Sequence, residues 1–179
     1  GNGGDCGSLQ VEADDAVWVA GTFNGMGGNS DNTGGNGGSA TLVAGTGGQF
    51  LYVLALDVRG GNGDAGGNAG LVSSLSDGAI VMDGGRFDVS GGAGSSGIGG
   101  NAGSILLSTA DSSLLVAGAL RALGGHGTTQ GGSGGLIQLS TEGAVTASAG
   151  NLTVHQTATL VANGGPASLG GAGGHGGRI

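Results

Sequence analysis

The sequence GGNGG at residues 34–38 decides the fold of this chain, because close variants of it return at a nearly constant period. The variants lie at residues 66–70, 99–103, 131–135 and 173–177, with successive spacings of 32, 33, 32 and 42 residues. Residues 1–7 resemble a degenerate sixth copy. Repetition at a fixed period predicts stacked coils, since one coil buries its apolar face only against the next.

A strand is predicted directly after each copy, because apolar residues alternate there with Ser, Thr or Gln. Two positions after the motif the chain carries Leu9, Ala40, Val72, Ile105, Ile137 and Ile179. Four positions after it the chain carries Val11, Leu42, Ser74, Leu107 and Leu139. Alternation at the same phase in every copy places one apolar column above another.

Two further strands are predicted in each repeat. One is marked by an apolar residue four positions before the next Gly-Gly pair, namely Phe23, Leu56, Phe87, Leu120 and Leu160. The other is an alternating stretch at 16–20, 50–54, 79–82, 114–117 and 152–154. The fold class is therefore all-β: a parallel β-solenoid of about five ~32-residue coils, each with three short strands and a glycine-rich segment.

Residues 1–179 are predicted to form a single repeat domain. Its coils run roughly over 1–38, 39–70, 71–103, 104–135 and 136–177, and residues 178–179 begin the next coil. The longer last spacing indicates an insertion within residues 142–156, which we expect to protrude as a loop.

Glycine is concentrated in one sector of each coil. The chain holds 49 glycines, and 38 of them fall in residues 1–7 and in the tails that end with the motif copies. Each complete tail opens with Gly-Gly-X, where X is Asn29, Asn62, Ala93, His126 or Pro166. Two interpretations stay open: turn-rich loops that use positive φ, or polyglycine-II-like segments with three residues per turn, whose backbone groups bond to packed neighbours.

A polar column is predicted within the glycine motif. It consists of Asn36, Asn68, Asn101, Ser133 and His175, one from each copy. Stacked Asn side chains can form an amide ladder like those of cross-β structures. The glycine-rich calcium nonapeptide is the alternative, but the sequence at 60–64 places its Asp one position early.

Composition and charge exclude several classes of protein. The formal charge is −8 without a single Lys, so neither nucleic-acid binding nor attraction to an anionic membrane is expected. With one Pro and no strict triplet period, the chain is not collagen-like, and its 37% hydrophobic content argues against a disordered linker. No apolar run approaches the length of a membrane-spanning helix, so no membrane insertion is expected.

No catalytic residue, cofactor or metal site is predicted. The three His residues lack metal-ligand spacing, and most Asp residues fall at expected strand ends and turns. Asp57, Asp88 and Arg121 share a column near Arg86, which we expect to be solvated surface pairing. Trp18 and Tyr52 either fill the core or form an exposed platform for a sugar, and surface glycans are therefore a possible partner.

The repeat form resembles the glycine-rich β-solenoid repeats of large secreted or surface-anchored bacterial proteins, adhesin-like proteins among them. The Gly-Gly-X tails are also similar to the polyglycine-II bundles of some antifreeze proteins and phage tail-fibre tips. The first resemblance covers nearly the whole chain and implies an extracellular or cell-surface location and a structural role.

Neither end of the repeat array carries a predicted polar cap, so we expect both ends to expose strand edges and apolar side chains. The candidate assembly contacts are Leu9, Val11, Arg178 and Ile179. The expected function is a structural protein whose copies stack head to tail into an extracellular filament. The alternatives are a non-polymerising stalk or adhesin segment of a longer surface protein, and a glycan-binding or glycan-cleaving β-helix.

Overall fold

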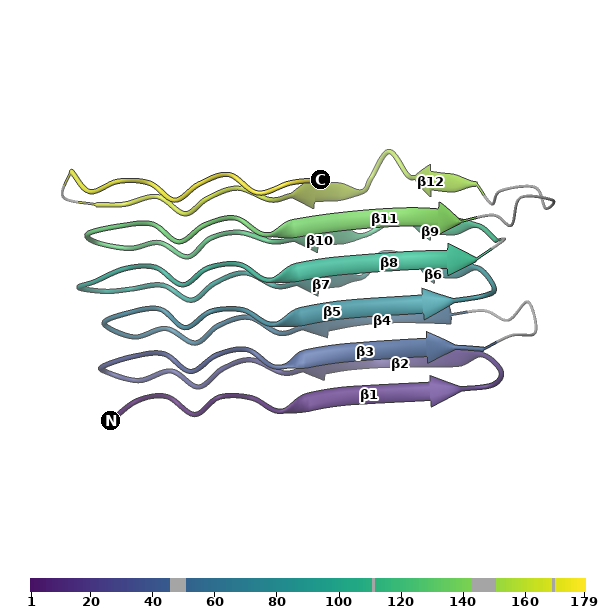
Figure 1. The fold of residues 1–179 in the computed structure, drawn as a ribbon, viewed down its shortest axis with the longest axis horizontal. Helices are drawn as coiled ribbons and strands as arrows, with labels where there is room; N and C mark the ends of the chain where they lie inside the picture. Colours follow the sequence, from purple (N-terminus) through teal and green to yellow (C-terminus); the bar gives the residue numbers. More distant parts are fainter. Residues whose placement is uncertain (46–50, 111, 143–150, 169) are drawn as a thin grey trace.

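The chain folds into a stack of similar coils that rise from the N-terminus to the C-terminus (Figure 1). The computed structural model describes residues 1–45, 51–110, 112–142, 151–168 and 170–179. Within these residues every strand pairs in parallel with strands of neighbouring coils, and none of the elements is a helix. The predicted all-β parallel solenoid is confirmed.

The first sheet contains one strand from each coil, in chain order. Its strands are β1 (Ser8–Ala13), β3 (Ser39–Ala44), β5 (Leu71–Ser76), β8 (Ser104–Ala110) and β11 (Leu136–Glu142). The register is unbroken, so residues at equivalent distances from the glycine motif stack directly. A bridge between Leu136 and Arg178 continues this register to the last residues of the chain.

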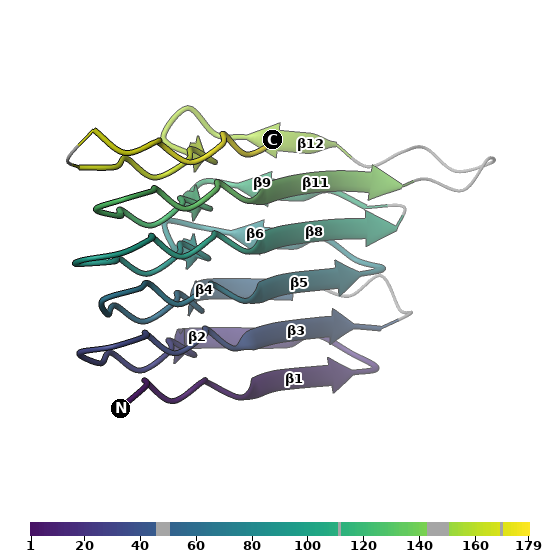
Figure 2. The same cartoon turned by 60° about the vertical axis from the view of Figure 1, so that its left-hand side comes forward.

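The second sheet contains eight strands on the opposite side of the stack (Figure 2). They are β2 (Val17–Asn24), β4 (Leu51–Asp57), β6 (Ile80–Met82), β7 (Arg86–Asp88), β9 (Leu114–Val116), β10 (Ala119–Arg121), β12 (Leu152–Val154) and β13 (Thr159–Val161).

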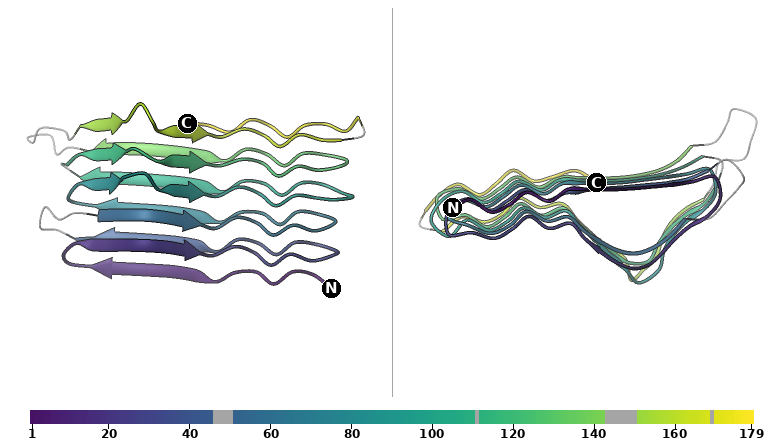
Figure 3. Two further views of the ribbon diagram at one scale, coloured as in Figure 1. Left: turned by 180° about the vertical axis from the view of Figure 1, so that it is seen from behind. Right: turned by 90° about the horizontal axis from the view of Figure 1, so that it is seen from below.

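The prediction of three strands per coil needs one correction. Within the described residues the first two coils have two strands each, because β2 and β4 run on where the later coils break into two short strands. The break reflects extra residues: Tyr52 pairs with Val81 and Ala55 with Arg86, so the third coil must fit more chain into the same interval. Gly84 turns that chain at φ 69°, a conformation that favours glycine. Figure 3 shows the corner at which the second side of every coil bends.

The predicted insertion within 142–156 lies largely outside the described residues. Strand β12 belongs to the described part of this segment, and it pairs in register with β9.

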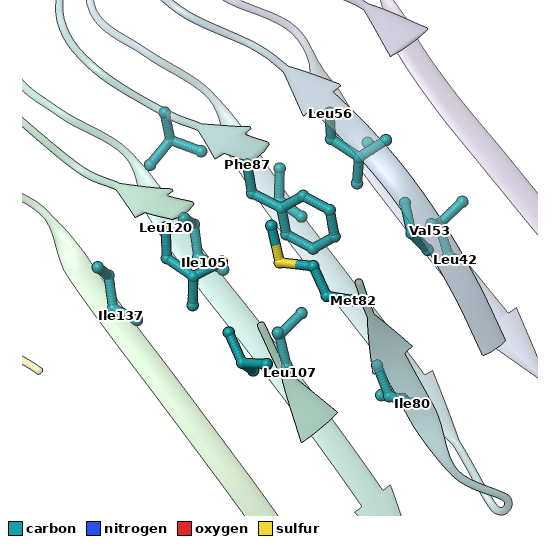
Figure 4. Packing of buried hydrophobic residues seen from close by; sticks show 14 of the residues in the cluster. Leu42, Val53, Leu56, Ile80, Met82, Phe87, Ile105, Leu107, Leu120 and Ile137 are labelled. Carbon is teal, nitrogen blue, oxygen red and sulfur yellow. The ribbon is translucent and has the colours of Figure 1, made fainter. Parts of the chain in front are cut away.

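The apolar core fills the space between the two sheets (Figure 4). The predicted inward columns are confirmed: Ala40, Val72, Ile105 and Ile137 are buried in the first sheet, and Leu56, Phe87 and Leu120 face them from the second. Paired strands of successive coils lie about 4.8 Å apart, so equivalent side chains touch and each coil completes the burial of its neighbour.

The glycine segments form a separate two-layered extension beside this core (Figure 3). In each coil an outgoing pass leaves the second sheet and a return pass leads to the next strand of the first sheet. In the outgoing pass of the second coil, the N–H groups of Gly60 and Gly63 donate to the next coil. Gly61 donates to the return pass of the previous coil, and Asn62 to a side chain of that coil. The direction of donation thus repeats every three residues.

The return pass follows the same rule. Gly66 and Ala69 donate to the next coil, Gly67 donates to the outgoing pass of its own coil, and Asn68 donates to a side chain of the previous coil. Each pass therefore bonds to neighbours on several sides, and its backbone groups are satisfied although the segment is neither helix nor sheet.

Close approach of backbones explains why the passes consist of glycine. A Cβ built on Gly67 would overlap the carbonyl oxygen of Gly35, and a Cβ on Gly35 would overlap that of Gly4. Positive φ is not the reason, because only Gly84 and Gly170 adopt it among the described glycines. Of the two interpretations of the tails, the turn-rich loop therefore lacks the conformation that it requires along most of their length.

Candidate functional site

The predicted polar column lies on the outside of the return passes. Asn36, Asn68 and Asn101 are exposed and stacked, and each Oδ1 accepts the backbone N–H of the residue above it. The donor–acceptor distances are 3.0 Å to Asn68, 2.9 Å to Asn101 and 2.9 Å to Ser133. The ladder thus joins side chain to backbone, where the sequence had suggested amide to amide.

The ladder begins one position earlier in the column than predicted, at Asp5. The carboxylate of Asp5 accepts the N–H of Asn36 at 2.6 Å, so an acid can take the place of an amide in this column. At the other end, the backbone carbonyl of His175 accepts a hydrogen bond from Gly134. Ser133 and His175 continue the column in space.

A second ladder runs along the outgoing passes, and sequence reasoning missed it. The Oδ1 of Asn29 accepts the N–H of Asn62 at 2.7 Å, and the Oδ1 of Asn62 accepts the N–H of Ala93 at 2.7 Å. The available signal was the Gly-Gly-X phase, which placed these residues in one column without indicating that they bond.

The candidate assembly contacts lie at the two ends of the stack. Leu9 and Val11 are only partly buried in β1, although the equivalent positions in the next coil are fully buried. At the other end, Arg178 is exposed and Ile179 is 71% exposed.

The last coil also exposes its second sheet. Leu152 and Val154 of β12 are 47% and 46% exposed, whereas their partners Leu114 and Val116 in β9 are fully buried. Burial of these positions therefore depends on a coil above, which is present for β9 and not for β12 within the described residues.

The charged column on the second sheet differs from the expectation. Asp57 and Asp88 stack as predicted, with Arg121 in the next coil, but they are only 7% and 3% exposed. Asp57 binds Arg59 at 2.9 Å and Arg86 at 3.3 Å. The expectation of solvated surface pairing is therefore wrong for both carboxylates, because arginines from two coils cover them.

The contact with Asp57 favours the charged form of the Arg59 guanidinium. The hydrogen bond from Arg59 Nε to the carboxylate raises the pKa of the guanidinium above its usual value, although partial burial opposes this. Asp88 is held in turn by the N–H and hydroxyl of Ser90, at 3.1 and 2.5 Å.

The remaining candidate residues do not converge. His126 contacts Ser168 at 2.8 Å and His155 contacts Thr157 at 2.8 Å, both on exposed surface. Among the described residues no three His, Cys, Asp or Glu side chains gather as metal ligands would. Trp18 is exposed and its backbone pairs with that of Tyr52, whose side chain lies outside the description.

Comparison with known proteins does not narrow the function, since no protein-family model, curated protein or solved structure matches this chain. A search of the described residues found no helix long and apolar enough to cross a membrane.

Proposed function

We propose that this chain is a structural protein whose copies stack head to tail into an extracellular or cell-surface filament. The observation that carries the proposal is the exposure of Leu152, Val154 and Ile179 at positions that the coils below bury. A further coil in the same register would cover these side chains and pair the open strand edges. A head-to-tail contact of this kind does not close, so it generates a filament.

We also propose that the glycine passes are polyglycine-II-like. The support is the three-residue repeat in the direction of their N–H donors, which matches a backbone helix of three residues per turn. In the filament this layer would continue from copy to copy as backbone hydrogen bonds, beside the apolar core.

One glycine column allows contacts between copies to be disturbed without disturbing contacts within one copy. Gly4, Gly35 and Gly67 occupy equivalent positions, and a Cβ on either of the last two would overlap a carbonyl oxygen of the coil before. A Cβ on Gly4 meets nothing within 4 Å. If another copy stacks below β1, its last return pass would place a carbonyl at that point.

The test is therefore the variant Gly4→Ala. We expect it to fold with an unchanged melting temperature and to remain monomeric by electron microscopy and light scattering, under conditions in which the wild type forms filaments.

Gly1→Ala, at the same end of the stack, is the matched control. A Cβ on Gly1 likewise meets nothing within 4 Å, and the equivalent positions above it carry the side chains of Asn32 and Asp64, so this variant should assemble like the wild type. Wild-type protein that stays monomeric at high concentration would contradict the filament and favour the non-polymerising stalk. Filaments of Gly4→Ala equal to those of the wild type would contradict this stacking register.

A further inference from the structure

A hollow of about 250 Å³ opens beside the charged column, where the second sheet passes into the glycine layer. Its walls include Asn29 and Asn62 of the second ladder, together with Arg59 and Arg121. Three of the four arginines in the chain lie in or next to this region, although the chain as a whole carries a charge of −8. The same region holds the carboxylates of Asp57 and Asp88, so three guanidinium groups face two carboxylates and the region carries a small positive excess on an acidic molecule.

The amide side chains present donors to the hollow. Asn29 Oδ1 already accepts the N–H of Asn62, and Asn62 Oδ1 accepts that of Ala93. With their oxygens engaged, each side chain retains its NH₂ group for a ligand.

Arg121 adds the charge. Within the described part of the chain its guanidinium takes part in no ion pair or side-chain hydrogen bond, whereas Arg59 and Arg86 both bind Asp57. A guanidinium offers five N–H donors in a planar fork, and this fork matches a carboxylate in two parallel hydrogen bonds.

The acceptors on the walls are already occupied. Asp88 Oδ1 accepts both the N–H and the hydroxyl of Ser90, and Oδ2 faces Arg86 Nε at 3.8 Å. The hydroxyl oxygen of Ser90 accepts the N–H of Leu123 at 3.3 Å. The free hydrogen-bonding capacity of the hollow is therefore mainly that of donors.

We propose that this hollow binds the carboxylate of a small polar acid, with Arg121 as the charged partner and the NH₂ groups of Asn29 and Asn62 as orienting donors. Its volume lies just below the roughly 300–1,000 Å³ of pockets for drug-sized ligands, so the ligand is about the size of one sugar ring or one short dicarboxylate. This site is independent of the filament contacts, which lie at the ends of the stack.

The test compares D-glucuronate with D-glucose, its neutral counterpart without the carboxylate, and adds succinate as an acid without a sugar ring. D-glucuronate, D-glucose and succinate are titrated into isotopically labelled protein that is kept below the concentration at which filaments form, and the backbone amide shifts of residues 59–62, 88–91 and 121–123 are followed. We expect saturable shifts with glucuronate and none with glucose. A shift with succinate as well identifies the carboxylate alone as the recognised group, and its absence shows that the sugar hydroxyls contribute.

The variant Arg121→Gln should weaken glucuronate binding tenfold or more, and added salt should weaken it in the wild type. Arg178→Gln removes the same charge from a distant position and should leave binding unchanged. Equal shifts with glucose, no shift with either acid, or equal binding by Arg121→Gln would overturn the proposal. Both variants should keep the wild-type melting temperature, so loss of binding cannot be attributed to unfolding.

Discussion

At the scale of single residues, the glycine layer tolerates no side chain where backbones meet. Gly67→Ala should destabilise the fold by about 3 kcal/mol or more, because its Cβ would overlap the carbonyl oxygen of Gly35 and both backbones are fixed by hydrogen bonds. Chemical denaturation measures the change. Gly4→Ala, in the same column at the end of the stack, serves as the control, and equal stability losses for the two variants would contradict the proposed packing.

A buried hydroxyl group in the apolar core lowers the stability of the fold. Ser74 is 2% exposed, its Oγ has no hydrogen-bond partner among the described residues, and it stacks between Leu42 and Leu107. An unsatisfied buried hydroxyl costs roughly 1–3 kcal/mol.

Ser74→Val should therefore raise the free energy of unfolding by about 1 kcal/mol, since it removes that cost and the leucines above and below show that the column accepts a larger side chain. Thermal melting provides the measurement. Ser73→Val, on the outer face of the same strand, should change stability by less than about 0.5 kcal/mol. A destabilised Ser74→Val would show that the hydroxyl has a partner.

At the scale of elements, the Asn ladder ties each return pass to the next. Asn68→Ala should cost about 0.5–1 kcal/mol, because the N–H of Asn101 loses its acceptor. Asn68→Asp should preserve the bond, as Asp5 does at the bottom of the ladder. The rate of hydrogen exchange at the backbone N–H of Asn101 measures the loss of this bond. Faster exchange in both variants would show that Asp at position 68 does not replace the Asn oxygen as acceptor.

Strand positions could be predicted because one count from the glycine motif applies to every coil. The count placed Ile105 above Val72 and Leu120 above Phe87, as the structure has them. The count did not reveal that β2 and β4 are continuous. Apolar and polar residues alternate on both sides of the corner in every coil, whether or not the backbone between them pairs with the next coil. The second Asn ladder was missed because a column shows which residues are neighbours and not which atoms bond.

The charged column shows the same limit. The sequence placed Asp57, Asp88 and Arg121 together, but burial of Asp57 also depends on Arg59, two residues further along the same coil, and on Arg86, which reaches it from the next coil. The contact of Arg86 with a carboxylate of the coil below is a three-dimensional property that the spacing within one coil does not encode.

At the scale of the whole molecule, two cores of different chemistry stand side by side. The aliphatic core between the sheets excludes water from side chains, whereas the glycine layer buries mainly backbone, such as that of Gly61, Gly67 and Gly100. Unfolding the first core hydrates apolar surface, which raises heat capacity, and unfolding the second hydrates peptide groups, which lowers it.

The heat-capacity change of unfolding should therefore fall below the roughly 12–15 cal/mol/K per residue of ordinary globular proteins. Differential scanning calorimetry at several pH values measures it, and an ordinary value would contradict this division of the interior. A small heat-capacity change flattens the curve of stability against temperature. The backbone layer would thus give the molecule a wide thermal range, and in particular resistance to unfolding in the cold.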